Sequence, residues 1–258
     1  MLTLISPAKT LDFSSDELPV RTTSPQMLAD THELMDTART LSSGDLQKLM
    51  GVSKSLGDLN RDRFQSFVAG RGKAPESRAA ALAFRGDTYI GLQADDFDAD
   101  DLSFAQEHLR ILSGLYGLLR PLDRIQPYRL EMGVRLATDR GKNLYSFWGG
   151  RIAQAINRQA KKSGAAAIVN LASKEYFTAA SERLLKVDVI TPAFKELRDG
   201  QPKIISFAAK RARGMMARHI IKHRLTDPRS MLDFEQDGYR FNRKLSTDTQ
   251  WVFLRKTG

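Results

Sequence analysis

The sequence contains no cysteine, and this absence excludes disulfide bonds and thiolate chemistry. It fits a reducing compartment. No apolar run approaches the roughly 18 residues that a membrane-spanning helix needs. The N-terminus starts as a predicted strand with no basic segment before it, so we expect no signal peptide. Together these absences predict a cytoplasmic protein that has no membrane contact.

Internal repeats and low-complexity tracts are also missing, which argues against a solenoid and against a disordered tail. With 258 residues and 41% hydrophobic content, the chain can bury a full core. We predict a single domain over residues 1–258 that includes a helical subregion over residues 24–84. Strands and helices are mixed and partly connected as hairpins, which predicts an α/β (α+β) fold with a mixed β-sheet flanked by helices.

Hydrophobic periodicity and turn residues predict the individual elements. Strands are expected over residues 2–5, 89–90, 115–119, 167–171, 187–190, 194–197, 203–205, 239–241 and 251–254. Helices are expected over residues 24–41, 76–84, 103–112 and 144–162, and from about residue 206 to a point before Pro228. Residues 46–56 are expected to form two short helices, and residues 127–133 to be extended.

Positive charge is in excess, because 40 Lys and Arg residues face 30 Asp and Glu residues and give a net charge of +10. The excess lies mostly from Lys203 to the C-terminus and between Arg110 and Arg151, whereas one acidic run spans residues 95–101. A basic protein without a membrane helix most often binds a polyanion or an anionic small molecule. The alternative is that the charge serves solubility only.

Three predicted strands each run into a turn that contains a serine and a lysine. The three pairs are Ser6 and Lys9, Ser173 and Lys174, and Ser206 and Lys210. Ligands of open α/β sheets bind beyond the carboxyl ends of the strands, where hydroxyl, ammonium and helix N–H groups can hold an anion. Convergence of the three turns would form a pocket for phosphate or carboxylate. Taken singly, such a serine is more often a helix N-cap and such a lysine a solvated side chain.

Arg129 and Glu131 alternate with apolar residues, so both charges face the same side of the extended segment. In a pocket, Arg129 could clamp an anion through two hydrogen bonds while Glu131 orients that anion or acts as a base. On an open surface the two side chains would form an ion pair of little consequence for stability.

The helix expected after residue 206 carries a stripe of cations. Arg211, Arg218 and Lys222 are spaced by seven and four residues and therefore share one face, and Arg213 lies on the same helix. Such a stripe suits contacts with the phosphates of double-stranded DNA. The alternative is a solvated amphipathic helix.

Residues 46–56 resemble a helix-hairpin-helix, whose turn offers backbone N–H groups to a DNA phosphate. The turn would contain Gly51 and Ser53, and Lys48 and Lys54 would flank it. The usual motif has two small residues around an aliphatic one, and here a serine takes one of those places, although it adopts positive φ less freely than glycine. The alternative is an ordinary helical corner.

The sequence offers little for metal binding or known catalytic chemistry. His219 and His223 are four residues apart, as in zinc-binding helices, but no Glu follows the first histidine, and Arg218 and Lys222 lie beside the pair. No cysteine is available as a third ligand. P-loop and dinucleotide-binding fingerprints are absent, as is a Ser/His/Asp order. We expect no metal and no cofactor, and no recognised catalytic motif.

Several strings in the sequence resemble the YaaA peroxide-stress protein family, once catalogued as a family of unknown function. They are residues 5–12 (ISPAKTLD), 110–123 (RILSGLYGLLRPLD), 127–133 (PYRLEMG), 170–173 (NLAS), 175–177 (EYF) and parts of 205–214 (ISFAAKRARG). The resemblance spans nearly the whole chain.

The resemblance implies a cytoplasmic protein that protects against hydrogen peroxide by lowering unincorporated iron and that binds DNA. It also implies an unusual α/β fold with a helix-hairpin-helix and a basic cleft. Two hypotheses follow. The first is a non-enzymatic protein that binds double-stranded DNA without sequence specificity. The second is an enzyme or sensor that binds a small phosphorylated or carboxylated ligand in the Ser/Lys/Arg pocket.

Overall fold

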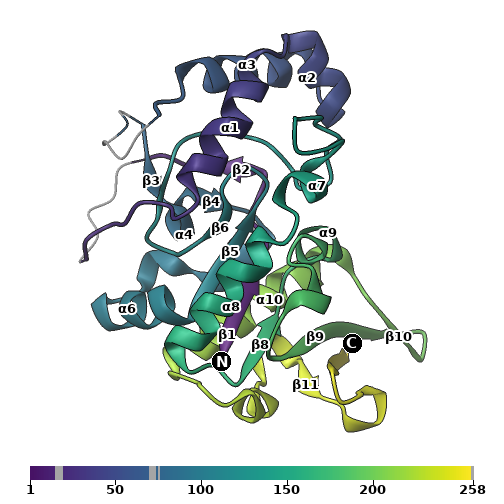
Figure 1. Ribbon diagram of the computed structural model, residues 1–258. Helices are drawn as coiled ribbons and strands as arrows, with labels where there is room; N and C mark the ends of the chain where they lie inside the picture. Colours follow the sequence, from purple (N-terminus) through teal and green to yellow (C-terminus); the bar gives the residue numbers. More distant parts are fainter. Residues whose placement is uncertain (15–19, 70–73, 75, 257–258) are drawn as a thin grey trace.

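A mostly parallel central sheet organises the computed structural model, which describes residues 1–14, 20–69, 74 and 76–256 (Figure 1). The sheet has eight strands in the order β11-β12-β9-β8-β1-β5-β6, with β10 paired to β9. Its strands are β1 (Leu2–Ile5), β5 (Leu109–Ser113), β6 (Gly117–Leu119), β8 (Ala167–Asn170), β9 (Asp188–Arg198), β10 (Gln201–Lys203), β11 (Arg240–Phe241) and β12 (Gln250–Lys256). Two small ladders pair β2 (Thr10–Leu11) with β4 (Phe84–Arg85) and β3 (Arg78–Ala79) with β7 (Arg124–Ile125).

Five neighbouring strands, β5, β1, β8, β9 and β12, run parallel to one another. Strands β6, β10 and β11 pair antiparallel with their neighbours. In the register, Thr3 of β1 lies opposite Leu109 on one side and Val169 on the other. All four residues of β1 are buried, as expected for a parallel strand whose two faces are both covered. The predicted mixed sheet flanked by helices is therefore confirmed.

Helices cover both faces of the sheet, with α8 in front of it and α10 behind it in Figure 1. The α-helices are α1 (Leu28–Arg39), α2 (Ser43–Met50), α3 (Lys54–Ser66), α4 (Ala80–Ala83), α5 (Asp87–Leu92), α6 (Ala99–His108), α7 (Leu144–Trp148), α8 (Arg151–Ser163), α9 (Lys174–Thr178) and α10 (Ser206–Lys222). Short 3₁₀ helices are η1 (Ala94–Asp96), η2 (Glu182–Leu184), η3 (Pro228–Asp233), η4 (Gln236–Gly238) and η5 (Arg243–Leu245). No helix in the described part of the chain is long and apolar enough to cross a membrane.

Helices α5 and α10 approach each other without side chains between their backbones. A Cβ atom at Gly214 of α10 would lie 1.8 Å from the carbonyl oxygen of Thr88. A Cβ atom at Gly91 of α5 would lie 2.1 Å from the carbonyl oxygen of Arg211. Only glycine fits at either position, because real Cβ atoms do not approach other atoms so closely. This contact fixes α5 against the first half of α10.

The secondary structure predicted for residues 76–84 and 89–90 was wrong. Residues 89–90, expected as a strand, belong to α5, which follows Gly86 with its positive φ of 155°. The helix expected over residues 76–84 is reduced to α4, which lies between β3 and β4. Arg78 and Arg85 in those two strands both bind Asp12, so tertiary contacts override the helix propensity of the alanines.

Other elements differ mainly in their boundaries. The first helix starts at Leu28, after the predicted start at residue 24. The helix expected over residues 144–162 is divided into α7 and α8 at Gly149, where φ is 49°. Residues 109–112, expected in the preceding helix, belong to β5, and the two strands expected over 187–197 are one strand, β9. The predicted turn at Asp199 and Gly200 is confirmed by the β9–β10 pairing.

Candidate functional site

The turns after β1 and β8 meet, as the sequence predicts for two of its three Ser/Lys turns. The hydroxyl of Ser6 accepts a hydrogen bond from the backbone N–H of Ser173 at 2.9 Å and donates one to the Ser173 hydroxyl at 3.4 Å. Ser173 is also the N-cap of α9, where its hydroxyl accepts from the N–H of Tyr176 at 3.4 Å. Ser173 is therefore a helix N-cap, and it also joins two of the three turns that were expected to converge.

One carboxylate oxygen joins the first turn to the extended segment. Oε1 of Glu131 lies 2.9 Å from Nζ of Lys9 and accepts hydrogen bonds from Nε and Nη2 of Arg129 at 3.2 and 3.1 Å. The Glu131 side chain is only 16% exposed, whereas that of Lys9 is 66% exposed. The pair expected between Arg129 and Glu131 is thus a three-membered cluster, in which a carboxylate of the protein occupies the place between two cations.

Three buried tyrosines lie near these turns and the extended segment. The hydroxyl of Tyr89 donates to the carbonyl oxygen of Ser6 at 3.1 Å, and the hydroxyls of Tyr128 and Ser113 are 2.6 Å apart. Burial raises the pKa of Tyr89, Tyr128 and Tyr176 above the ordinary value for a phenol. The three phenols therefore stay neutral and serve as hydrogen-bonding groups under the polar surface.

A groove of about 430 Å³ lies beside Glu131. Its lining residues are Lys48, Leu49, Glu131, Gly133, Val134, Arg135 and Glu175. Glu175 fixes one wall, because its Oε1 accepts from the N–H of Gly133 at 2.9 Å. The groove brings Lys48 of α2, predicted to contact DNA, beside Glu131, predicted to lie in the anion pocket. The two sets of candidates thus share one surface, which contains two cations and two carboxylates.

The third Ser/Lys turn is placed differently from the first two. Strand β10 ends at Lys203, and Ser206 is the first residue of α10. Ser206, Lys210 and Lys174 are all exposed, and none of them has a side-chain contact with Ser6 or Lys9 in the described part of the chain. Helix α5 connects the two regions, because it packs against α10 and begins after Gly86, whose Cβ would lie 3.3 Å from that of Ala8.

The predicted pair of short helices around Gly51 is confirmed as α2 and α3. Gly51 has a φ of 61°, and its N–H and that of Val52 both donate to the carbonyl oxygen of Gln47. Ser53 has an ordinary φ of −65° and caps α3 by accepting from the N–H of Leu56 at 3.4 Å. The serine therefore fits the turn without strain. Lys48 and Lys54 are exposed, and DNA binding by this corner stays a prediction.

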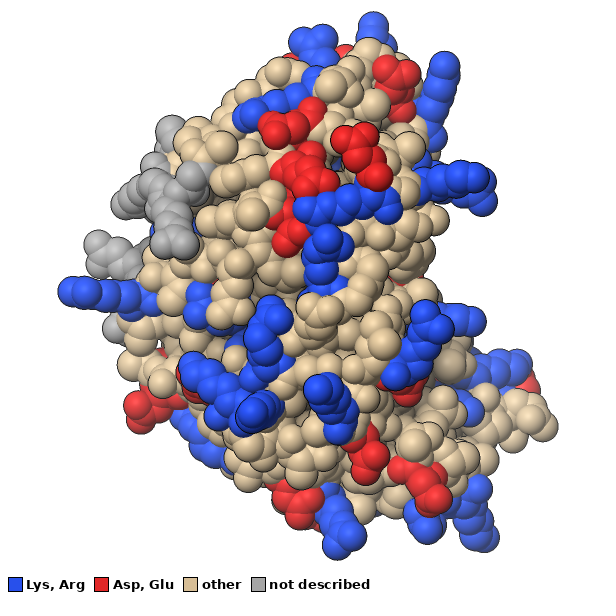
Figure 2. All heavy atoms as spheres, viewed as in Figure 1, with Lys and Arg blue, Asp and Glu red and all other residues tan. Residues whose placement is uncertain are grey.

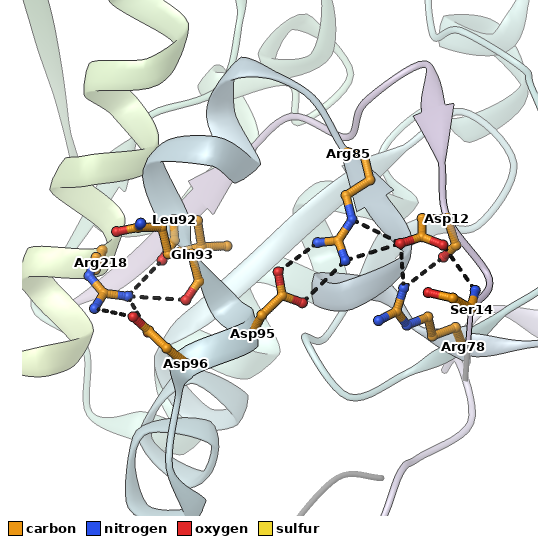
Figure 3. A network of polar contacts seen from close by, with 9 residues as sticks. All are labelled: Asp12, Ser14, Arg78, Arg85, Leu92, Gln93, Asp95, Asp96 and Arg218. Carbon is orange, nitrogen blue, oxygen red and sulfur yellow. Dashed lines mark hydrogen bonds and ion pairs between the residues drawn. The ribbon is translucent and has the colours of Figure 1, made fainter. Parts of the chain in front are cut away.

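Two cations of the predicted α10 stripe are ion-paired with the acidic run, and Figure 3 shows the first of them, Arg218. Nη1 and Nη2 of Arg218 bind the two carboxylate oxygens of Asp96 at 2.5 and 2.9 Å. Lys222 binds Asp101, which also accepts from Arg224 at 2.7 Å. Burial raises the pKa of Asp101, but hydrogen bonds from Lys222 and Arg224 outweigh it and leave that pKa below its usual value.

The acidic run also binds Arg85 of β4, so it is a structural counter-charge for cations of more than one element. Arg85 lies between Asp95 and Asp12, at 2.8 and 3.2 Å, and Asp12 in turn binds Arg78 at 3.1 Å (Figure 3). Hydrogen bonds from Ser14 and the two arginines hold the pKa of Asp12 below its usual range. Charges that the sequence places in separate blocks are therefore neutralised locally.

The first half of α10 is different, because none of its cations has an acidic partner in the described part of the chain. Lys210 and Arg211 are exposed, and Arg213 is half-buried. None of the three forms an ion pair with a described residue. Burial lowers the pKa of Arg213 below its usual value. The positive charge that remains available on α10 thus lies in its first two turns.

Basic side chains on the face viewed in Figure 2 are scattered, while acidic ones gather near α1. Part of that gathering is explained by Arg140, which pairs with Asp30 at 2.5 Å and also with Glu33 of α1. A single basic cleft is not evident on this face. The rings of His219 and His223 lie with their centroids 4.3 Å apart and are tilted by 43°. Among the described residues, no group of three or more His, Cys, Asp or Glu side chains could hold a metal ion.

Sequence reasoning missed Tyr89, Glu175 and Tyr176 as parts of the site. Glu175 and Tyr176 follow Ser173 directly and lie in the same short helix, so their place in the chain was the available signal. The sequence contained no such signal for Tyr89, because its hydrogen bond to Ser6 depends on where the fold places α5.

Comparison with known proteins identifies the relatives of this chain. The sequence profile described as peroxide stress protein YaaA matches residues 1–245. The chain belongs to this family. A UPF0246 protein of Saccharophagus degradans is 52% identical over 256 residues, which cover 99% of this chain and 100% of the relative. A UPF0246 protein of Jannaschia sp. is 54% identical over 256 residues, with 99% and 97% coverage. Membership of the YaaA family is consistent with a role in peroxide stress.

Proposed function

We propose that this YaaA-family protein binds double-stranded DNA without sequence specificity as part of a peroxide stress response. The observation that carries the proposal is the set of cations on the first half of α10. Lys210, Arg211 and Arg213 have no carboxylate partner among the described residues, whereas Arg218 and Lys222 on the second half are paired. Unpaired cations are available for phosphates, which carry no sequence information.

The α2–α3 corner supports the same proposal from a second position. Lys48 and Lys54 are exposed on either side of Gly51, and no ion pair engages them within the described residues. Lys48 also lines the groove that contains Arg135. Contacts from two separate elements would fix the direction of the DNA across the protein while leaving its bases unread.

The proposal is tested by titrating a random-sequence duplex at several salt concentrations and following fluorescence anisotropy. Simultaneous Lys210→Glu and Arg211→Glu substitutions should weaken binding at least tenfold. They should also reduce the salt slope by about 1.8, because each phosphate contact contributes about 0.9. The matched control is Arg243→Glu with Lys244→Glu, which changes the net charge equally at exposed positions of η5.

An equal loss of affinity in both double variants would show that net charge alone attracts the DNA, and it would overturn the assignment to α10. Binding that does not depend on salt, or no binding at 50 mM salt, would overturn the proposal itself. Alanine at Lys48 and Lys54 should lower affinity independently of the α10 substitutions, because the two elements would contact different phosphates.

We also propose that the protein limits damage from unincorporated iron by occupying DNA that iron would otherwise reach. A cation surface that covers phosphates competes with Fe²⁺ for the same oxygen ligands. The test is strand breakage of a plasmid by Fe²⁺ and hydrogen peroxide. Wild-type protein should reduce breakage, and the Lys210→Glu, Arg211→Glu variant should not. Equal protection by both proteins would contradict this route.

A second candidate function is the binding of a small phosphorylated or carboxylated ligand at the ends of β1 and β8. The observation that favours it is the shared carboxylate of Glu131, which lies between Lys9 and Arg129 as a ligand anion would. The hydrogen bonds between Ser6 and Ser173 place two hydroxyls at the same edge of the sheet.

Thermal-shift screening of nucleotides and sugar phosphates tests this second candidate. A ligand that binds only the folded protein at 100 times its dissociation constant adds about 2.7 kcal/mol of stability. Arg129→Ala should abolish the shift, whereas Arg135→Ala should leave most of it, because Arg135 has no ion pair with Glu131 among the described residues. Absence of a shift for every compound, with full peroxide resistance of a Lys9→Ala strain, would contradict the candidate function.

A further inference from the structure

The two most exposed large apolar side chains in the described part of the chain are neighbours. Phe207 is 63% exposed and Ile204 is 61% exposed, more than any other large hydrophobic residue described. Ile204 lies between β10 and α10, and Phe207 is the second residue of α10. Single exposed apolar residues are ordinary on protein surfaces, but a phenyl ring left largely in water beside an exposed isoleucine is not required by the fold.

Two cations lie beside this ring. Residues three and four positions apart are neighbours on a helix surface, so Lys210 and Arg211 lie beside Phe207 on the next turn. Both cations are exposed and have no ion-pair partner among the described residues. The Phe207 ring likewise stacks on no other described ring. An apolar patch made for another protein would be expected to lack lysine at its centre, because lysine is depleted there.

We propose that Phe207, assisted by Ile204, is a stacking platform for an unpaired base of single-stranded nucleic acid, whose phosphates lie on Lys210 and Arg211. Proteins that bind single strands combine cations along the backbone with aromatic rings on which bases stack. In a duplex the base faces are covered, so a ring can reach them only after a step has been unstacked, which costs a few kcal/mol. The platform therefore favours unpaired over paired DNA.

This inference rests on the proposed DNA binding and adds to it a discrimination between forms of DNA. The cations alone would bind single strands and duplexes through their phosphates. The ring adds a contact that only an unpaired base can make at no unstacking cost. The predicted surface is thus a site for gaps, frayed ends or single-stranded stretches, approached from the first turn of α10.

The test compares the affinities of a 20-nucleotide oligothymidylate and a 20-base-pair duplex for the full-length protein. Phe207→Ala should weaken binding of the single strand by about 5- to 100-fold, the effect of losing one stacked base, and should change duplex binding less than twofold. Phe207→Trp should restore single-strand binding, because indole stacks at least as well as phenyl. Phe207→Leu should not restore it, because it is apolar but has no ring. Leu184→Ala, which truncates another exposed apolar residue in η2, is the matched control.

The tryptophan variant also gives a direct signal of stacking. Trp148 is fully buried and Trp251 is half-buried, so the fluorescence of an exposed indole at position 207 can be separated from theirs. Oligothymidylate should quench this added fluorescence, and the duplex should quench it much less. Equal quenching by both would mean that the ring meets no base face and would overturn the inference.

Other outcomes separate this inference from the proposed function. If wild-type protein binds duplex with the expected salt slope but Phe207→Ala leaves single-strand affinity unchanged, the stacking platform is wrong and DNA binding stands. If neither form of DNA binds, both are wrong. If Phe207→Ala instead abolishes concentration-dependent self-association in sedimentation and leaves single-strand affinity unchanged, the patch is a contact between copies of the chain and the inference is overturned.

Discussion

Ser6 and Ser173 are 167 residues apart in the sequence, and a hydrogen bond of 2.9 Å joins the hydroxyl of the first to the backbone N–H of the second. The bond closes the carboxyl ends of β1 and β8, which are neighbours in the sheet. The carbonyl oxygen of Ser6 accepts a second hydrogen bond, from the hydroxyl of Tyr89 at 3.1 Å. Through these two contacts, Ser6 joins the start of α9 and Tyr89 of α5 to the same turn.

Replacement of Ser6 by alanine should lower the free energy of unfolding by about 1–2 kcal/mol, because the half-buried N–H of Ser173 loses its acceptor. Urea denaturation at pH 7 measures the change. Ser55→Ala, on the exposed side of α3, is the control and should change stability by less than about 0.5 kcal/mol. Equal effects of the two substitutions would show that the bond between the turns adds nothing.

Glu131→Gln should strengthen the binding of anions to the site. The substitution removes the negative charge that lies 2.9 Å from Lys9 and 3.1 Å from Arg129, so both cations become available to a ligand phosphate. Affinity for duplex DNA and for phosphorylated compounds should rise severalfold at low salt. Glu175→Gln is the matched control in the same groove, since Glu175 accepts a hydrogen bond from the N–H of Gly133. A rise in affinity for Glu175→Gln but not for Glu131→Gln would contradict the role given to Glu131.

Gly214→Ala should destabilise the protein by about 1–3 kcal/mol or more, because its methyl group would lie 1.8 Å from the backbone of Thr88. Thermal unfolding or urea denaturation measures the loss. Gly44→Ala in α2 is the matched helical control, with its nearest neighbour 3.8 Å away. That control should be neutral or stabilising by up to about 1 kcal/mol, as alanine is the better helix former. Tolerance of alanine at position 214 would contradict the close approach of α5 and α10.

Acidification should release the contacts of the acidic run. The pKa of Asp101 is lower in the folded protein than its ordinary value of 3.8, so this carboxylate stabilises the fold above pH 4, and its contribution is lost as the pH falls further. Asp101→Asn should cost about 1–3 kcal/mol at pH 7, since Lys222 and Arg224 lose their charged partner.

The difference in urea stability between wild type and Asp101→Asn should therefore shrink between pH 5 and pH 2. Asp100→Asn is the control, because Asp100 is exposed on the same helix and has no ion pair with a described residue. A difference that stays constant with pH would mean that the charge of Asp101 does not contribute to stability.

The sequence predicted the parts of the fold that local patterns determine. Strands β1 and β8 are short, continuous apolar runs, and their ends meet because neighbouring parallel strands end at the same edge. The αL position of Gly51 was also evident from the glycine between two helical patterns. In contrast, the Ala-rich residues 80–83 have strong helix propensity, and their context as a buried link between β3 and β4 was not visible locally.

The pairing of charges was the part of the site that the sequence concealed. Arg218 and Asp96 are 122 positions apart, so their contact depends on how α10 packs against η1. Helical spacing correctly placed Arg218 and Lys222 on one face, but it could not tell whether that face meets water or carboxylates. The same spacing applies to Lys210 and Phe207, whose exposure became clear only from the fold.

Helix α5 has a mechanical consequence for the two surfaces of the protein. Gly91 of α5 packs directly against the backbone of Arg211 in α10. Tyr89 of α5 donates a hydrogen bond to the carbonyl oxygen of Ser6. The six residues of α5 thus form a rigid connection between the first half of α10 and the turn after β1. With no space for a side chain between the backbones, a shift of α10 by even a fraction of an ångström must be carried to that turn or be resisted by it.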